Sequence, residues 1–248
     1  MQKHIGQKME LYSILTIIFI FSIIQSVMGV GLLVFGTPTL LLCGLSFHET
    51  LGIVLPPSII ISLMQVCEAK VPSKDYFKSE FNKFCLPFVL VGMAIALTLA
   101  QSVDFKYFVG IMLIISGSIR LFKQFEAILI KVIKKNRKLY QVLMGLIHGL
   151  TNMGGGLLVL FSSSMHHNKL DIRSGVAYGY LFMGTLQYLT LLIYDISFLK
   201  FNILFYIITA TLTYGVLGKR LFYRTHESIF QKMITSIIFL YGIILFVK

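Results

Sequence analysis

The stretch Met153-Gly154-Gly155-Gly156-Leu157-Leu158-Val159 lies in the middle of a long apolar run, and it decides how the chain is organised. Each glycine costs a helix about 1 kcal/mol relative to alanine, so three together predict a break in the helix. A related stretch, Met28-Gly29-Val30-Gly31-Leu32-Leu33-Val34, lies 125 positions earlier and has identical residues at six of its seven positions. The sequence therefore predicts two structural repeats, each with a Gly-rich broken or re-entrant segment.

The composition around these stretches is that of a membrane protein. Of 248 residues, 56% are apolar and only 13% are charged, whereas soluble domains carry about 25% charged residues. A water-soluble enzyme, a disordered chain and a secreted disulfide scaffold are therefore excluded. A spanning helix needs roughly 20 residues, so we expect an all-α polytopic membrane protein with about seven or eight transmembrane helices. The apolar runs are 11–34, 50–67, 84–102, 107–125, 139–164, 174–194, 201–217 and 230–247.

Basic residues give the chain a net charge of +12, and they gather between the apolar runs. This arrangement is typical of charges that set membrane orientation, and nucleic acid is not an expected partner. We expect a first transmembrane repeat over 1–125, a basic cytoplasmic linker over 126–138 and a second repeat over 139–248. With a cytoplasmic N-terminus, the positive-inside rule favours a run 140–164 that enters and leaves on one side, which places Lys248 outside.

A broken helix in lipid leaves backbone N–H and C=O groups without partners, at a cost of several kcal/mol per group. Such main chain is tolerated where it binds a ligand or lines a cavity, and the N-terminus of a half-helix favours an anion. We therefore expect one anion site where the two breaks meet. Its expected residues are the glycines that supply backbone donors and the side chains beside them, namely Gly29, Gly31, Gly154, Gly155 and Gly156, with Thr37, Pro38, His148, Asn152 and Ser162.

These residues also have plainer interpretations. The glycines suit close helix packing, Asn152 suits a helix cap, and the hydroxyl of Ser162 can bond back to its own helix. His148 is the ionisable residue in the middle of a run; it either carries a coupled proton or stays neutral and bonds a neighbouring carbonyl. No phosphate loop, nucleophile–base pair or metal-ligand set is evident, so we expect no enzyme activity, no metal and no cofactor.

At these residues the chain resembles the sulfite exporter TauE/SafE family of membrane permeases, over essentially its whole length. Segments 28–38 and 152–159 are similar to the two Gly-rich copies of that family, with Pro38 as the proline that follows the first copy. The chain departs from the family pattern at Leu32-Leu33 and at Ser163, where a proline belongs. The resemblance implies a permease that moves sulfite, a sulfonate or a related small anion across the cytoplasmic membrane.

The partners expected from this interpretation are a small anionic substrate, the lipid bilayer and a coupling proton or cation. A gradient is the expected driver because the chain has no nucleotide-binding motif. The competing hypothesis is a non-transporting membrane scaffold, or an anchor subunit that holds a soluble partner through its basic loops. The sequence leaves open whether the chain forms a homo-oligomer.

Overall fold

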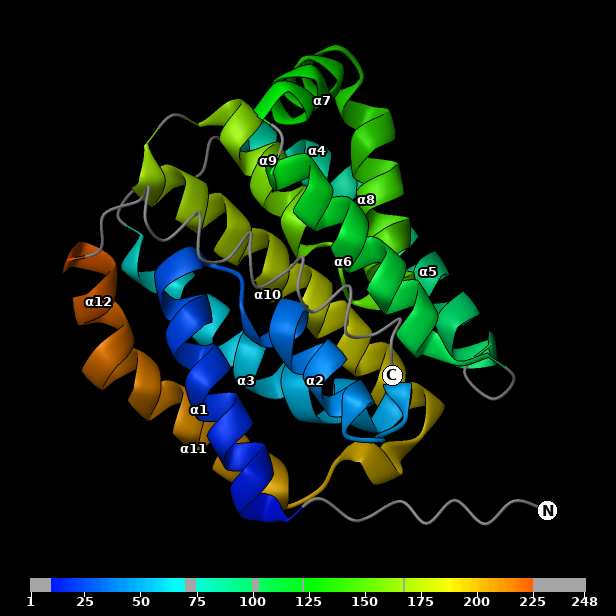
Figure 1. The fold of residues 1–248 in the computed structure, drawn as a ribbon, viewed down its shortest axis with the longest axis vertical. Coiled ribbons are helices and arrows are strands. Elements are labelled where there is room, and N and C mark those ends of the chain that lie inside the picture. The colour runs from blue at the N-terminus through cyan, green and yellow to red at the C-terminus, as the bar shows by residue number, and fades with distance from the viewer. Residues whose placement is uncertain (1–9, 70–74, 100–102, 122, 167, 225–248) are drawn as a thin grey trace.

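The computed structural model describes residues 10–69, 75–99, 103–121, 123–166 and 168–224, and within these ranges the chain is helical without a strand (Figure 1). The elements in chain order are α1 (Leu11–Met28), the π-helix η1 (Leu32–Gly36), α2 (Thr37–Leu42), α3 (Phe47–Glu68), α4 (Asp75–Phe84), α5 (Leu86–Leu99), α6 (Phe105–Leu121), α7 (Lys123–Lys135), α8 (Arg137–Thr151), α9 (Gly155–Met165), α10 (Lys169–Tyr194), the 3-10 helix η2 (Ile196–Phe198), α11 (Asn202–Thr213), the π-helix η3 (Tyr214–Gly218) and α12 (Lys219–Arg224).

Helix length and composition agree with an all-α membrane protein. The stretches that are long and apolar enough to span a bilayer are Leu11–Met28, Phe47–Glu68, Lys78–Leu99 and Lys169–Tyr194. Shorter apolar helices cover Leu32–Leu42, Phe105–Ile115 and Gly155–Met165. The count of seven or eight crossings stays a prediction, because two of the apolar runs are divided by their breaks. The run 230–247, near the end of the expected second repeat, lies outside the described residues.

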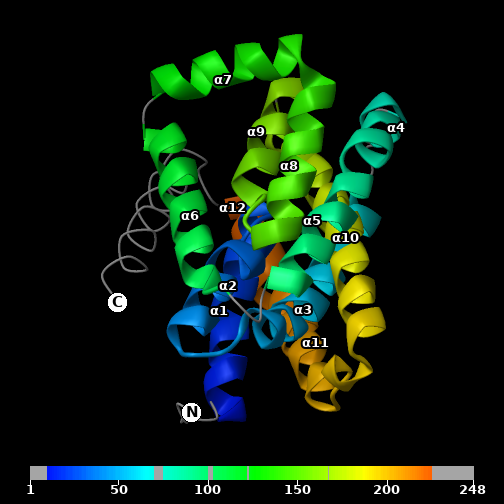
Figure 2. The ribbon, with the colours of Figure 1, turned by 90° about the vertical axis from the view of Figure 1, so that its right-hand side faces the viewer.

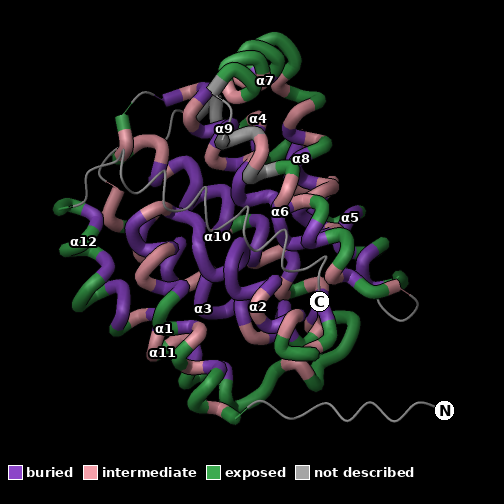
Figure 3. The backbone as a smooth tube through the Cα atoms, in the orientation of Figure 1, coloured by how far each residue is buried: buried purple, intermediate pink, exposed green. Residues whose placement is uncertain are grey.

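The buried core follows α3 and α10, which pack along each other, together with the two broken segments (Figure 3). Large apolar side chains on the outer faces of the helices are exposed instead, among them Phe19, Val91, Ile193 and Leu212. A soluble protein rarely exposes contiguous apolar surface on this scale. These outer faces are therefore suited to contact with lipid chains.

A second extensive contact joins α5 and α8, whose backbones approach closely because glycines lie between them. A Cβ at Gly149 would meet the carbonyl oxygen of Val89, and one at Gly92 would meet that of Leu146. Gly145 and Gly149 are four residues apart and share one helix face, as in the small-residue interfaces of membrane helices. This packing fixes α8, which leads into the second break.

Both breaks turn the chain back toward the side from which it came. Gln65, near the end of α3, donates from Nε2 to the carbonyl oxygen of Ser26, near the end of α1, at 3.2 Å. Helices α1 and α3 therefore run in the same direction, and the segment between them returns the chain (Figure 2). In the second half, Nη1 of Arg137 lies 3.8 Å from Sδ of Met165. The run 140–164 thus begins and ends at the same end of the bundle, which agrees with the expected return of this run.

One end of the bundle, here called the basic end, contains the end of α3 and the starts of α8, α10 and α12. The start of α3 lies at the opposite end, where the rings of Phe47 and Phe105 stack 4.4 Å apart and His48 stacks on Tyr194. Leu11 is also at this opposite end, so the expectation that the N-terminal side shares a face with the basic loops is wrong. The run 11–34 reverses at Gly29 instead of crossing once.

Candidate anion site

The first break follows α1, which ends in the left-handed conformation at Gly29, with φ of +77°. The N–H of Gly29 donates to the carbonyl oxygen of Gln25 at 2.8 Å. The chain then folds back so closely that a Cβ at Gly31 would meet the backbone of Gln25 and lie 2.7 Å from the carbonyl oxygen of Phe21. Only glycine fits at Gly31, after which η1 begins at Leu32.

The second break also begins at a residue in the left-handed conformation. Helix α8 ends at Asn152, which is left-handed with φ of +61°, and the N–H of Asn152 donates to the carbonyl oxygen of His148 at 2.8 Å. Helix α9 begins at Gly155. The left-handed residues Gly29 and Asn152 are 152 − 29 = 123 positions apart, whereas the identical residues of the two stretches are 125 apart. Residues that are identical in the two stretches therefore occupy structurally different positions in the two breaks.

At each break, a buried side chain accepts the backbone N–H that begins the following half-helix. Oε1 of Gln25 accepts from the N–H of Leu32 at 3.2 Å, and Nδ1 of His148 accepts from the N–H of Gly154 at 3.2 Å. Gln25 and His148 are also 148 − 25 = 123 positions apart. Both have no exposed surface. These two side chains satisfy donors that the break would otherwise leave unpaired in lipid.

A glutamine from the next long helix binds the other side of each break. Gln65 of α3 donates from Nε2 to the carbonyl oxygen of Gln25 at 3.0 Å, and Gln187 of α10 donates from Nε2 to that of His148 at 3.1 Å. Gln25 in turn donates from Nε2 to the carbonyl oxygen of Ser58 at 3.0 Å. The broken helices are thus held by buried amides, which lie in the middle of otherwise apolar runs.

The two breaks meet, as the sequence predicted. Nδ2 of Asn152 donates to Oγ1 of Thr37, at the start of α2, at 2.9 Å. Gly155 packs against the hydroxyl of Tyr180, and a Cβ there would lie 2.8 Å from Cγ2 of Val34 in η1. Residues far apart in the sequence therefore form one buried polar centre, which also contains the first turn of α9.

Several polar atoms of this centre have no hydrogen-bond partner among the described residues. They are Nε2 of His148, Oδ1 of Asn152 and Oε1 of Gln187, all buried. Because Nδ1 of His148 accepts a hydrogen bond, the neutral ring carries its proton on Nε2. Nε2 is therefore an N–H donor, and the side chain of Gln187, which interacts with this ring, or a bound ligand can satisfy it. The expected neutral histidine is present, but it binds an amide N–H rather than a carbonyl.

The structure brings together most, but not all, of the predicted residues. Those with a contact at the meeting point or in the second break are Thr37, His148, Asn152, Gly154 and Gly155, and Pro38 and Gly156 directly follow Thr37 and Gly155 in the chain. Gly31 packs against the backbone of α1 instead. Gly29 faces Val176 and Arg173 on α10. Ser162 lies two turns along α9, where its hydroxyl donates to the carbonyl oxygen of Ile172 at 2.9 Å. Asn152 caps the end of α8 and not the start of α9, where Gly154 has no side-chain cap.

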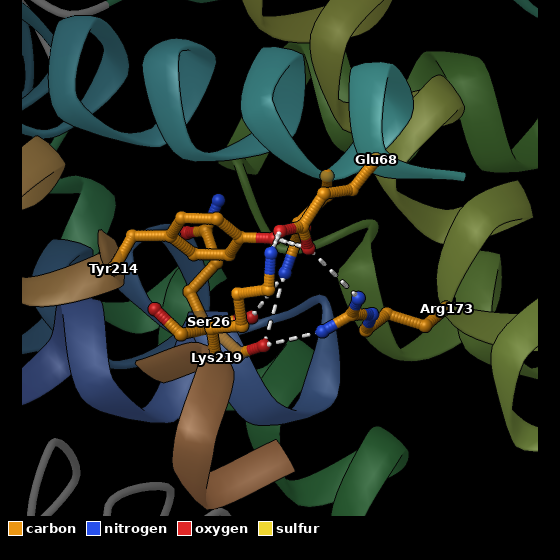
Figure 4. Close-up of polar contacts among 7 residues, drawn as sticks. Ser26, Glu68, Arg173, Tyr214 and Lys219 are labelled. Carbon is orange, nitrogen blue, oxygen red and sulfur yellow. Dashed lines mark hydrogen bonds and ion pairs between the residues drawn. The ribbon is translucent and has the colours of Figure 1, made fainter. Parts of the chain in front are cut away.

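A second polar group, at the basic end, was not predicted from the sequence (Figure 4). Glu68 pairs with Nζ of Lys219, accepts from the hydroxyl of Tyr214 at 2.7 Å and lies 3.8 Å from Nη2 of Arg173. Arg173 also donates to the carbonyl oxygen of Ser26 at 3.2 Å. The carboxylate raises the pKa of Lys219, mainly through their hydrogen bond. This cluster joins α1, α3, α10 and α12.

A cavity of about 290 Å³ opens beside the Glu68 cluster. Its lining residues are Gln65, Glu68, Ala69, Leu170, Asp171, Arg173, Ser174 and Tyr223. Gln65 links this cavity to the first break, because its Nε2 holds the end of α1 while its Oε1 is buried without a partner among the described residues. The cavity therefore lies at the basic end and borders a residue that holds the first break.

Replacing Glu68 with glutamine is expected to lower the free energy of unfolding by about 2 kcal/mol, because the buried Arg173 loses its carboxylate. This expected loss of unfolding free energy is smaller than that for a fully buried ion pair, since 26% of the Glu68 side chain is exposed. Denaturant titration in detergent micelles measures it, with Glu126→Gln on α7 as the control. Adding Arg173→Gln to the Glu68 variant should cost less than the sum of the single changes; full additivity would contradict the pairing.

Comparison with known proteins agrees with the family suggested by the sequence. A family model described as Sulfite exporter TauE/SafE matches residues 14–245, nearly the whole chain. No curated protein and no solved structure matches this chain. Proteins of the matched family are transporters and not enzymes. The chain, with its apolar helices and two broken segments, therefore belongs to the sulfite exporter TauE/SafE family of membrane permeases.

Proposed function

We propose that this permease moves a small sulfur-containing oxyanion, such as sulfite, and binds it where the two breaks meet. The observation that carries this proposal is the buried polar centre itself, where Oδ1 of Asn152 has no partner among the described residues and the side chain of Gln187 is the group that interacts with the ring of His148. Buried polar groups with unfilled hydrogen-bonding capacity are costly, and a protonated oxyanion can both donate to Asn152 and accept from His148. The hydroxyl of Thr37 accepts from Asn152, and its own proton is a second donor for the ligand.

The start of α9 supplies the remaining attraction for an anion. Backbone N–H groups in the first turn of a helix have no partner within the helix, and the helix dipole makes this end positive. At this end the N–H of Gly154 is already bound to His148, so the donors that we assign to the ligand are those of Gly155 and Gly156. The unpartnered Oδ1 of Asn152 is an acceptor for the O–H of a protonated oxyanion.

We assign the basic end to the cytoplasm. It carries the described lysines and arginines of α7, α8, α10 and α12, whereas the opposite end holds Lys106 and Lys200 among the residues described. The positive-inside rule favours this orientation. Basic residues at the mouth of the cavity beside Arg173 also raise the local concentration of anions.

Movement of one half against the other is our proposed transport step, with the two halves acting as structural repeats. A proton gradient fits His148 as a coupling residue. Protonation of Nδ1 would place two N–H donors face to face and break the bond to Gly154. A charged His148 is therefore incompatible with the closed second break, and gaining a proton would favour its opening.

His148→Asn tests the binding site without removing the acceptor that holds Gly154. The asparagine Oδ1 can take the place of Nδ1, but the donor at Nε2 is lost. Loss of one hydrogen bond to an anion should lower the affinity roughly 10- to 100-fold. The measurement is flux in proteoliposomes with sulfite, sulfate, thiosulfate, sulfoacetate and a carboxylate control.

The expected result is saturable flux of one sulfur-containing anion in the wild type, and a raised half-saturation concentration in His148→Asn. Thermal unfolding of the variant should be close to that of the wild type. Unchanged half-saturation would remove His148 from the site. No flux of any anion in the wild type would instead favour the membrane scaffold hypothesis.

A further inference from the structure

Helix α7 lies across the basic end of the bundle, whereas α6, α8 and α9 run along the bundle (Figure 2). One face of α7 packs inward through Ile133, which is fully buried. A second face carries Phe125, Ile128 and Val132, which are 57%, 57% and 47% exposed. Their i, i+3, i+7 spacing places these three side chains in one row. Such a helix has the form of those that lie in the plane of a membrane interface.

The corner between α7 and α8 is hollow and strongly basic. A cavity of about 550 Å³ is lined there by Glu80, Lys134, Lys135, Asn136, Arg137, Lys138 and Leu139. Glu80 is 4.0 Å from Nε of Arg137. Lys134, Lys135 and Lys138 form no ion pair with any acidic residue in the described part of the chain. The cavity therefore has three positive charges without a carboxylate partner.

We propose that this corner binds the headgroup of an anionic phospholipid. The lysines around the cavity match a phosphodiester in charge, and the cavity is large enough for a headgroup. Apolar surface continues from it along the side of the bundle, where Leu139 and Leu143 of α8 are 59% and 48% exposed. A soluble phosphate would make no contact with that apolar surface, whereas the acyl chains of a lipid would pack against it. This combination favours a lipid over a free anion.

The position of the corner gives such a lipid a structural effect. Residues 134–139 connect α7 to the start of α8, and α8 leads directly into the second break at Asn152. A lipid held at the corner fixes the beginning of α8 at the membrane surface. The inference does not depend on which anion the permease moves.

The test compares the full-length protein with a Lys134→Gln, Lys135→Gln, Lys138→Gln triple variant in detergent micelles. Native mass spectrometry measures bound phosphatidylglycerol, with phosphatidylcholine and glycerol phosphate as the two comparison ligands. Lys106→Gln with Lys200→Gln, at the opposite end, is the control. We expect retained phosphatidylglycerol in the wild type and the control, and roughly 100-fold weaker retention in the triple variant, about tenfold or less per lysine.

Each remaining outcome contradicts the proposal in a different way. Equal retention by the triple variant would move the lipid to another surface. Equal binding of phosphatidylcholine would show that the charge of the lipid is irrelevant. Equal binding of glycerol phosphate would identify a soluble phosphate as the ligand. If the triple variant unfolds, single Lys138→Gln and Lys135→Gln variants give the same comparison with smaller changes.

Discussion

Gly155→Ala is expected to reduce anion flux roughly 100-fold, because one added methyl group displaces the groups around the proposed site. The new Cβ would overlap the hydroxyl of Tyr180 and lie 2.8 Å from Cγ2 of Val34. Neither neighbour can yield easily, since Tyr180 is fully buried and Val34 is 4% exposed. Flux of radiolabelled sulfite into proteoliposomes, normalised to folded protein, measures the loss.

A matched control and a rescue make this result specific. Gly215, in η3, has no atom within 4 Å of an added Cβ, so Gly215→Ala should transport normally. Combining Gly155→Ala with Tyr180→Phe removes the oxygen that the methyl group meets, and should restore part of the flux. Normal flux in Gly155→Ala would show that the first turn of α9 is not at the transport site.

Asn152→Val should lower the free energy of unfolding by about 3 kcal/mol, from two separate causes. A β-branched residue at φ of +61° is strained, because its side chain clashes with the backbone. The substitution also removes the hydrogen bond to Thr37. The measurement is denaturant unfolding in micelles, followed by far-ultraviolet circular dichroism.

Asn152→Gly separates the two causes. Glycine adopts the left-handed conformation without strain, so this variant loses only the hydrogen bond, at a cost of about 1 kcal/mol. Thr37→Val should cost a similar amount, and little more when combined with Asn152→Gly. If the Asn152→Val and Asn152→Gly variants had equal free energies of unfolding, the left-handed backbone would have no energetic consequence.

The two breaks could be predicted from the sequence, because glycines grouped within an apolar run oppose a helix whatever surrounds them. The return of the second run to its own side also followed, from the distribution of basic residues. The reversal after Gly29 could not be predicted in the same way. The run 11–34 has only two glycines at its break, and its length suits a single crossing.

The polar contacts depend on information that a linear pattern does not contain. Alignment of identical letters pairs Gly29 with Gly154, whereas the backbone pairs Gly29 with Asn152. Only the backbone pairing reveals that Gln25 and His148 both accept the backbone N–H that begins the following helix. The partners of Glu68 come from helices more than 100 residues away. A glutamate at the end of an apolar run is usually solvated, so the linear pattern does not reveal these partners.

The hydrogen bonds at the centre are distributed unevenly between the halves. Gln25 and Gln65 hold the first break, and His148 and Gln187 hold the second, so each half closes its own discontinuity. Between the breaks, the described residues contribute the single bond from Asn152 to Thr37, worth about 1 kcal/mol. The contact between the two breaks can therefore open locally at low cost, whereas the α3–α10 and α5–α8 interfaces keep the two halves packed together.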